Sequence, residues 1–347
     1  MTINEILKLA VEKKASDVHL VAEEHPIIRI NGDLIRLEKM DKLSQSKIET
    51  LILSILNPKQ KQDYIKKREL DIAYDLDGSG RFRINLHFEK GSPSLAARVI
   101  KTDIPKMEHI NMPEIVFSLA RLNQGLILIT GPTGCGKSTS LAAIIDLINQ
   151  ERTCNIITLE DPIEFVFKPN KSIIRQRQFG FDFLSFPEAL KHVVRQDPNI
   201  IMVGEMRDLE TVAATITLAE TGHLVFATLH TPNAAQTIDR IIDIFPPHQQ
   251  DQIRIQLSMS LVSVISQQLI ATTDKKNRVA AREIMINTAA VSNLIRENKI
   301  SQIKTIIQTS ADDGMISMDQ SLRKLVKENI IDKQTAFIYA VDKSIFK

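Results

Sequence analysis

A glycine-rich segment in the middle of the chain carries the strongest chemical signal. It matches the pattern GxxxxGK[ST] in full, with an apolar run at 126–130 before it and the helical run LAAIIDLI at 141–148 after it. Glycines in such a loop let backbone N–H groups converge on a phosphate, and the helix that follows adds the positive end of its dipole. Lys137 would reach the outer phosphates, and the hydroxyl of Ser138 would ligate Mg²⁺. The residues predicted to bind the nucleotide are Gly131, Pro132, Thr133, Gly134, Cys135, Gly136, Lys137, Ser138 and Thr139.

A glutamate at the end of a second apolar run is the candidate for activating water. The run IIMVGE at 200–205 ends in Glu205, and the aspartate that usually precedes this acid is replaced by Gly204. Glu205 alone would then polarise the attacking water or support the water shell of the metal. The alternative is a glutamate that merely ends a strand, but its pairing with a phosphate loop favours the catalytic interpretation.

Three carboxylates follow a third apolar run. Glu160, Asp161 and Glu164 lie in the segment TLEDPIE at 158–164, just after the predicted strand NIITL. Parallel sheets bind ligands at the carboxyl ends of their strands, so this cluster can supply the carboxylate that the metal and the water need. We assign Glu160 and Asp161 to the Mg²⁺ site through metal-bound water. A solvated acidic turn is the other interpretation of these residues.

Two histidines bracket the buried run in TGHLVFATLHT at 221–231. Side chains alternate along a strand, so His223 and His230 would point to opposite faces, which argues against both binding one metal. His230 lies at the predicted carboxyl end, where it could hydrogen-bond the γ-phosphate or its water. His223 lies at the other end, where a structural hydrogen bond is an equal alternative.

Three arginines stand out in the N-terminal third. Arg81 and Arg83, in GRFRIN, are two residues apart and share one face of a predicted strand, and Arg98 lies on the next predicted strand. From the spacing alone, a solvated sheet face is the simpler interpretation of all three.

The elements that must position these residues fall into four segments. Residues 1–100 mix short β-rich runs with polar-faced helices, and the proline-containing stretch 101–114 is the predicted linker. From 115 to 287 apolar strands alternate with helices, which predicts an α/β core with a parallel sheet covered by helices on its faces. Residues 288–347 are helical in pattern and predict a C-terminal helical segment.

Composition narrows the class of protein. The 44 basic and 42 acidic residues give a net charge of +2, so the chain as a whole gives no reason to expect nucleic acid as a partner. No apolar run reaches the roughly 18 residues of a transmembrane helix, and the N-terminal residues have no signal-peptide core, so we expect a cytoplasmic protein. The two cysteines, Cys135 and Cys154, form no CxxC pair and predict neither a disulfide framework nor a zinc ribbon.

Together these motifs resemble the type II/IV secretion ATPase superfamily, and within it the type IV pilus retraction ATPases of the twitching-motility type. The resemblance covers nearly the whole chain. It rests on ASDVHL (15–20), ELDIAY (69–74), GRFRIN (80–85), GPTGCGKSTS (131–140), TLEDPIEF (158–165), RQDPNIIMVGEMRD (195–208) and AETGHLVFATLHT (219–231).

The resemblance implies an architecture and a set of roles. The architecture is a PAS-like N-terminal α+β domain, a RecA-like P-loop NTPase core and a hexameric ring that turns over ATP with Mg²⁺. The Gly-Glu form of the second nucleotide motif is normal in the family, and Glu164 corresponds to the functional acid of its aspartate box. His223 and His230 match its histidine box. The arginines that contact nucleotide from the N-terminal domain correspond to Arg81, Arg83 and Arg98.

The resemblance also implies a function, pilus disassembly and retraction, on the cytoplasmic side of the inner membrane. The implied partners are further copies of the chain, an inner-membrane platform protein and a paralogous retraction ATPase. One segment departs from the family: AAVSNLIRE at 289–297 has Val291 and Ser292 where isoleucine and arginine are usual in a motif tied to retraction. Cys135 also replaces a commoner small residue in the phosphate loop.

Three alternatives remain beside a retraction motor. A pilus-extension or type II secretion ATPase of the same superfamily usually carries a four-cysteine metal insert, which this chain lacks. An accessory subunit that binds nucleotide without hydrolysing it is disfavoured by the intact Lys137, Glu205 and His230. A nucleic-acid translocase is disfavoured by the near-neutral charge.

Overall fold

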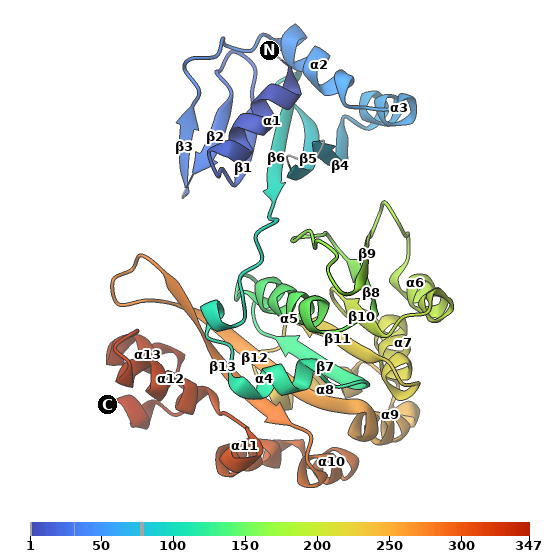
Figure 1. The fold of residues 1–347 in the computed structure, drawn as a ribbon, viewed down its shortest axis with the longest axis vertical. Helices are drawn as coiled ribbons and strands as arrows, with labels where there is room; N and C mark the ends of the chain where they lie inside the picture. The colour runs from blue at the N-terminus through green and yellow to red at the C-terminus, as the bar shows by residue number, and fades with distance from the viewer. Residues whose placement is uncertain (1, 31, 77–79) are drawn as a thin grey trace. The chain divides into compact units, whose positions relative to one another are not determined.

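The computed structural model describes residues 2–30, 32–76 and 80–347, and the chain divides into two compact units (Figure 1). The first unit is Met1–Asp103 together with the short segment Glu164–Val166, and the second is Ile104–Ile163 with Phe167–Lys347. Each unit has its own sheet and its own hydrophobic core.

The first unit is an antiparallel sheet with helices against one face. Its six strands run in the order β3-β2-β1-β6-β5-β4, and every neighbouring pair is antiparallel. A capping box between Thr2 and Glu5 begins the first helix, whose Ile6 and Leu7 pack with Val18 and Ile84 of the sheet. The elements are α1 (Ile3–Glu12), β1 (Asp17–Leu20), β2 (Ile27–Ile30), β3 (Asp33–Arg36), α2 (Gln45–Ser54), α3 (Pro58–Lys67), β4 (Glu69–Leu76), β5 (Gly80–Glu89) and β6 (Ser92–Ile100).

Alternation along β5 separates the two faces of this sheet. Phe82 and Ile84 are fully buried in the core, whereas Arg81 and Arg83 lie on the other face. The helices leave that second face free within the unit, and it carries the arginines singled out in the sequence.

The second unit is built around a seven-stranded sheet in the order β13-β12-β7-β11-β10-β8-β9. Its strands are β7 (Gly125–Thr130), β8 (Asn155–Glu160), β9 (Ile173–Gln178), β10 (Ile200–Val203), β11 (Leu224–Leu229), β12 (Leu261–Ala271) and β13 (Arg278–Ile286). Its helices are η1 (Glu108–Ile110), α4 (Glu114–Ala120), α5 (Lys137–Glu151), α6 (Phe186–Val193), η2 (Val194–Gln196), α7 (Leu209–Glu220), α8 (Ala234–Asp243), α9 (Pro247–Ser260), α10 (Ala289–Arg296), η3 (Ile300–Gln302), α11 (Ile303–Thr309), η4 (Ala311–Asp313), α12 (Met318–Lys327), α13 (Lys333–Tyr339) and η5 (Lys343–Phe346).

Helices cover both faces of this sheet. Leu126 and Leu128 of β7 belong to the core cluster that includes α6 to α11. The alternate residues Ile127 and Ile129 are equally buried and face the other side, where α4 and α5 pack against each other (Figure 1). Strands buried on both faces are continuously apolar, which is why β7, β8, β10 and β11 have no exposed position.

One strand departs from the parallel sheet predicted for the core. β13 pairs antiparallel with β12, while every other neighbouring pair in the sheet is parallel. A short polar turn closes this hairpin, with the backbone N–H of Thr272 donating to the carbonyl of Asn277. An antiparallel pair needs only such a short connection, so no helix intervenes between the two strands.

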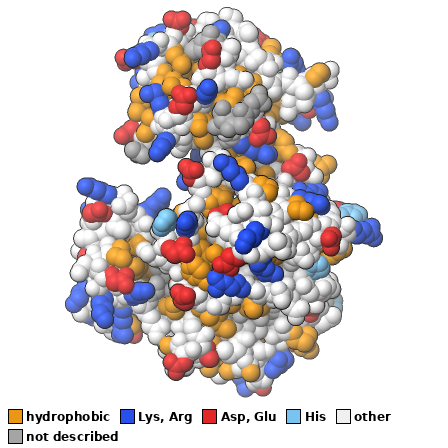
Figure 2. All heavy atoms as spheres, viewed as in Figure 1, with side chains coloured by type: hydrophobic (Ala, Val, Ile, Leu, Met, Phe, Trp, Pro, Cys, Tyr) orange, Lys and Arg blue, Asp and Glu red, His pale blue; other side chains and the backbone are white. Residues whose placement is uncertain are grey.

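The surface charge and the lengths of the helices do not by themselves identify a class of protein. Figure 2 shows acidic and basic side chains interspersed over the face that it displays, in keeping with the net charge of +2. Among the described residues, no helix combines the length and the apolar character that a bilayer span requires.

Candidate active site

The glycine-rich segment forms a loop between β7 and α5. Gly131 and Gly136 have φ values of +140° and +88°, a region that other residues rarely adopt. Space is also limiting, because a Cβ on Gly131 would lie 2.3 Å from the carbonyl oxygen of Gln267. Lys137 is the first residue of α5 and Ser138 follows in its first turn, so both stand where the helix dipole favours an anion.

The loop rests on β12. The side-chain amide of Gln267 donates to the carbonyl of Cys135 at 2.8 Å, and Cys135 itself is buried. Burial raises the pKa of the Cys135 thiol, so the side chain acts as a small apolar filler rather than as a nucleophile. This explains how a cysteine fits at this position of the loop.

The chemical groups predicted from four separate motifs meet at one edge of the sheet. β7, β11, β10 and β8 are neighbours in that order and run parallel, so their carboxyl ends lie side by side. The residues that follow these ends are the phosphate loop, His230, Glu205 and Asp161, in the same order.

Hydrogen bonds join these residues across the strands. The ammonium of Lys137 donates to the carbonyls of Gly131 at 2.7 Å and Pro132 at 3.2 Å, and it lies 3.4 Å from Nδ1 of His230. Nε2 of His230 lies 3.0 Å from Oε1 of Glu205. An ammonium can only donate, so Nδ1 of His230 accepts and its Nε2–H donates to Glu205.

Arg207 completes the arrangement. Its Nε donates to Oε2 of Glu205 at 2.9 Å, and its Nη1 lies 3.4 Å from Oδ2 of Asp161. The hydrogen bond to Glu205 raises the pKa of Arg207 above its ordinary value. Arg207 was not among the site residues predicted from the sequence. Its signal is its position two residues after Glu205, in the loop that leaves the same strand.

The glycine in place of the usual aspartate has a steric reason. A Cβ on Gly204 would lie 3.0 Å from the carbonyl oxygen of Leu159 and 3.2 Å from Cα of Glu160, both on the neighbouring strand β8. The hydroxyl of Thr228 on β11 also donates to the Gly204 carbonyl. The backbone here is therefore held between two strands, and Glu205 is the first residue with room for a side chain.

The predicted acidic cluster is divided. Glu160 is buried, and its Oε1 accepts from the hydroxyl of Thr158 at 2.6 Å and from the amide of Gln176 at 3.0 Å. Asp161 lies at the sheet edge, as described above. Glu164 belongs instead to the first unit, in the segment where the backbone N–H of Val166 donates to the carbonyl of Lys101.

His223 is not brought to this edge. It precedes the first residue of β11, at the amino end of the strand whose carboxyl end leads to His230. Its Nδ1 lies 3.0 Å from the carbonyl oxygen of Leu218 and 3.3 Å from the hydroxyl of Thr221. These contacts tie the end of α7 to the start of β11, and a catalytic role for His223 stays a prediction.

The three predicted arginines share the face of the first unit's sheet that the helices leave free. Arg83 and Arg98 are direct cross-strand partners on β5 and β6. Arg98 donates to Asp17 at 3.0 Å, and Arg81 lies 3.7 Å from Asp75. Both arginines therefore have an acidic neighbour within their own unit.

The oxygen groups at the sheet edge fit Mg²⁺. Mg²⁺ keeps several waters and takes one or two protein oxygens plus substrate phosphates, rather than a cage of side chains. The described residues contain no cluster of three or more His, Cys, Asp or Glu side chains arranged around a common metal position. Of the predicted metal residues, the Ser138 hydroxyl and the Asp161 carboxylate match such a sparse set of ligands.

A pocket of about 290 Å³ opens beside the phosphate loop. Gly136 and Thr139 line it on the loop side. Its other lining residues include three with cationic or titratable side chains: His109, Arg278 and Arg282.

A phosphate loop, a strand-end carboxylate and a histidine between them, all on the carboxyl edge of a parallel sheet, define a P-loop nucleotide hydrolase. The model of the family described as "Type II/IV secretion system protein" matches residues 1–336, and the chain belongs to this family.

Similar proteins match this chain over most of its length. The type IV pilus retraction ATPase PilT of Pseudomonas aeruginosa is 44% identical over 97% of this chain and 97% of its own, and the type IV pilus ATPase PilU of the same organism is 37% identical over 98% and 89%. A crystal structure of the pilus retraction motor PilT with bound ADP superposes with a TM-score of 0.92 at 43% identity, covering 99% of this chain and 98% of that one. The predicted α/β fold and the predicted class, an ATPase of the pilus-retraction type, are confirmed.

Proposed function

We propose that this chain couples ATP hydrolysis to disassembly of a type IV pilus, and so drives pilus retraction and twitching motility. The observation that carries the proposal is the continuous row of Lys137, His230, Glu205 and Asp161 at the sheet edge. This row provides the side chains that hydrolysis needs, in a chain that matches PilT over 97% of its length. The identity to PilT, which is named as a retraction ATPase, is 44%, and the identity to PilU, which is named only as a pilus ATPase, is 37%, which favours a retraction motor.

Hydrolysis in this site begins with the loop and its lysine. The phosphates of ATP would occupy the loop, and their oxygens would compete for the ammonium protons of Lys137 that now point at the loop carbonyls. Release of Lys137 from its carbonyl acceptors would therefore accompany nucleotide binding.

Glu205 would orient the attacking water and accept its proton. One of its oxygens is held by His230 and the other by Arg207, so the carboxylate is fixed at the strand end before substrate arrives. His230 stands between Glu205 and Lys137 and could bond the γ-phosphate or its water.

Ser138, Glu160 and Asp161 are the proposed Mg²⁺ residues, the two acids acting through metal-bound water. When bound, Mg²⁺ would neutralise charge on the outer phosphates. Because Glu160 is already engaged by Thr158 and Gln176, Asp161 is the better placed of the two acids.

Arg81, Arg83 and Arg98, with Glu164, are proposed to complete the site from the first unit. Negative charge develops on the transferring phosphoryl group, and an arginine delivered to it stabilises the transition state strongly. In the proposed homohexamer these arginines would serve the ATP site of a neighbouring subunit.

The remaining partners follow from the same function. We propose that the ring works on the cytoplasmic side of the inner membrane, against the platform protein of the pilus machine, and that a paralogue can share the work. We do not propose nucleic acid as a partner, given the net charge of +2.

The helix α10 holds the segment that departs from the family. Its Ser292 hydroxyl donates to the carbonyl of Ser258, whereas Asn293 is exposed and available to a partner.

Deletion of the gene tests the direction of the motor. We expect piliation to rise while twitching motility falls, because pili would still form but would not retract. Loss of pili would instead indicate an extension ATPase.

Complementation with Asn293→Ala adds a second test. Retraction should fail, while the ATPase activity of the purified variant should stay within about threefold of normal, because Asn293 is an exposed position on an amphipathic helix. A parallel fall of both would mean that α10 is only structural.

A further inference from the structure

A buried path of polar side chains runs behind the phosphate loop. Its members are Gln267 on β12, Ser140 on α5 and Arg282 on β13, with exposed fractions of 1%, 2% and 3%. None of them is among the residues assigned above to catalysis, metal binding or the loop itself.

The path is continuous from the loop to the segment that precedes α4. Gln267 donates to the Cys135 carbonyl at 2.8 Å, and the Ser140 hydroxyl donates to Oε1 of Gln267 at 2.9 Å. Nη2 of Arg282 donates to the Ser140 hydroxyl at 3.4 Å. Nη1 of Arg282 donates to the carbonyls of Ile110 at 3.1 Å and Asn111 at 3.0 Å.

The charge of Arg282 is unusual for its position. Buried arginines are normally paired with a carboxylate, yet Arg282 forms no ion pair with any residue that the structure describes, and its Nε is buried without a partner. Burial lowers the pKa of this guanidinium to about 10, so it remains protonated near neutral pH. The carbonyls of Ile110 and Asn111 and the Ser140 hydroxyl are thus what holds a cation inside the core.

We propose that Arg282 is a positioning residue that couples the phosphate loop, through Ser140 and Gln267, to residues 110–111, which lie within the predicted linker. It acts on the loop through the hydrogen bonds of Ser140 and Gln267. The inference rests on nucleotide binding by this chain and is independent of the pilus.

The direction of the hydrogen bonds gives the coupling its mechanism. Each donor points from the cation toward the loop, so every bond polarises the next one. The last acceptor is the Cys135 carbonyl, which belongs to the same peptide group as the N–H of Gly136. Withdrawing electrons from that carbonyl makes the N–H a stronger donor to phosphate. Coupling is reciprocal, so a nucleotide that fixes the loop also fixes the carbonyls at 110–111.

Ser140→Ala breaks the path while leaving the loop, Lys137 and the strands intact. The matched control is Ser263→Ala on β12, which removes an equally buried hydroxyl that donates to the Met285 carbonyl at 2.8 Å, away from the path. The probes are ADP and a non-hydrolysable ATP analogue. The readouts are the Kd for each, the kcat and KM for ATP, and hydrogen exchange of the peptide 104–115 with and without nucleotide.

We expect Ser140→Ala to raise Kd and KM about fivefold, the effect of one lost hydrogen bond, with kcat at saturation within about twofold of normal. Nucleotide should slow hydrogen exchange of the peptide 104–115 in the wild type and in Ser263→Ala. In Ser140→Ala, this slowing should be reduced by more than about half. An unchanged Kd together with undiminished nucleotide protection of 104–115 would overturn the proposal. So would an equal loss in Ser263→Ala.

Arg282→Lys provides a second, independent variant. Lysine keeps the charge but cannot reach two carbonyls and a hydroxyl with a planar fork, so protection of 104–115 should fall as in Ser140→Ala. If Arg282→Lys does not fold, the Ser140→Ala comparison alone decides. Wild-type protein that binds no nucleotide would contradict the ATPase assignment instead, which separates the two failures.

Discussion

The seven-stranded sheet gathers its charged side chains at one edge, where they bond to one another, whereas the six-stranded sheet spreads its arginines over an open face. At the edge, Glu205 is held from one side by His230 and from the other by Arg207. On the open face, Arg98 is paired with Asp17, and Arg81 lies near Asp75, so each has a local acid.

The comparison bears on the charge balance of the edge during hydrolysis. Lys137 and Arg207 at the edge are matched by Glu205 and Asp161, so the edge is balanced before a nucleotide arrives. ATP with Mg²⁺ would add net negative charge, and more develops on the phosphoryl group during transfer. Further cations would therefore favour hydrolysis, and we propose that the arginines of the first unit's open face supply them. The three predictions below test this comparison.

The largest effect should come from Glu205→Gln. The amide keeps the shape and can still bond to Arg207 or His230, but it cannot accept a proton. We expect kcat to fall by about 10²–10⁴-fold with the Kd for ATP nearly unchanged. Steady-state phosphate release and equilibrium nucleotide binding measure the two quantities.

Glu210→Gln is the matched control for this change. Glu210 is exposed in the first turn of α7, five residues along the chain, and has no place in the edge network. Its turnover should equal that of the wild type. Wild-type turnover in Glu205→Gln as well would show that the edge carboxylate is not the base.

The second prediction addresses the open face. Each of Arg81, Arg83 and Arg98 is replaced by alanine in turn. Whichever of them contacts the phosphoryl group should, when replaced, lower turnover by at least about tenfold. Thermal stability should change little in all three variants, because these side chains are not in the core. Arg29→Ala is the control, because Arg29 contacts the same Asp17 at 3.8 Å from the neighbouring strand but is not among the predicted arginines.

Mixing subunits decides whether the arginines act between chains. A Lys137→Ala subunit has intact arginines and a defective loop, so a mixture with an arginine variant contains some complete sites. Activity of the mixture above that of either variant alone is the expected result. Absence of rescue in mixed oligomers would confine the arginines to their own chain.

The parts of the site that sequence could predict are those with local signatures. The phosphate loop is recognisable because glycine spacing, the preceding apolar strand and the following helix are contiguous. Lys137, Glu205, His230 and Asp161 all follow buried strands, and a parallel sheet brings strand ends together, so their meeting could be expected.

Contacts that depend on packing could not be predicted in this way. The pairing of Glu205 with Arg207, the burial of Glu160 against Thr158 and Gln176, and the support of the loop by Gln267 depend on neighbours set by the fold. Gln267 lies 132 positions from Cys135 and has no motif around it. The antiparallel direction of β13 was missed because the residue pattern of a strand does not reveal the direction in which it pairs.

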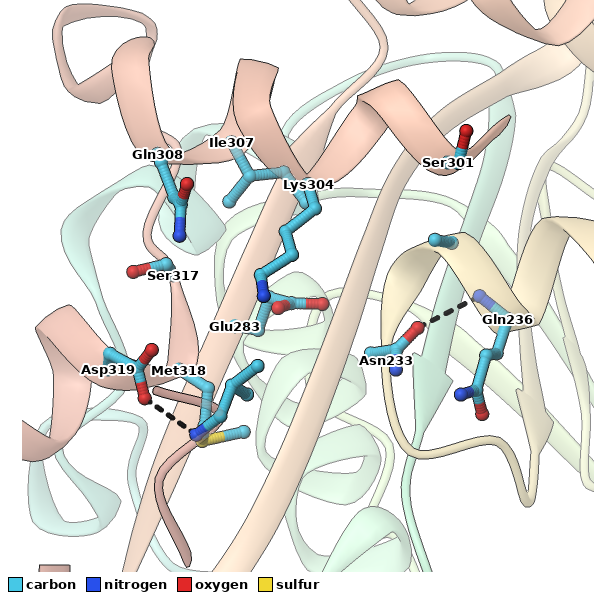
Figure 3. Close-up of a pocket in the computed structure, with 12 residues that line it drawn as sticks. Asn233, Gln236, Glu283, Ser301, Lys304, Ile307, Gln308, Ser317, Met318 and Asp319 are labelled. Carbon is cyan, nitrogen blue, oxygen red and sulfur yellow. Dashed lines mark hydrogen bonds between the residues drawn. The ribbon is translucent and has the colours of Figure 1, made fainter. Parts of the chain in front are cut away.

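A buried carboxylate outside the hydrogen-bonded row at the edge carries the smallest predicted effect. Glu283 on β13 lines a pocket with Lys304 and Asp319, and Lys304 points toward it (Figure 3). Its Oε1 accepts from the backbone N–H of Ala234 at 2.9 Å, at the start of α8. Burial raises the pKa of Glu283 and the nearby Asp319 raises it further, whereas the hydrogen bond from Ala234 and the charge of Lys304 lower it by less. Unlike the carboxylates of the edge, this one has no close ion pair among the described residues.

The sign of its pH dependence follows from the raised pKa. The folded state binds the proton of Glu283 more tightly than the unfolded state does, so the free energy of unfolding rises as pH falls through the folded pKa, and ionised Glu283 lowers stability above it. Glu283→Gln keeps an acceptor for Ala234 and removes the charge. We therefore expect its Tm to exceed the wild-type value by about 2 °C near pH 8, with the difference shrinking as pH falls toward the ordinary range of a glutamate, about 4–5. Thermal unfolding across that range measures it, with Glu210→Gln as the exposed control that should show no such trend. A Tm for Glu283→Gln that is lower than wild type and independent of pH would mean that Lys304 compensates the buried charge fully, as the pairs at the catalytic edge compensate theirs.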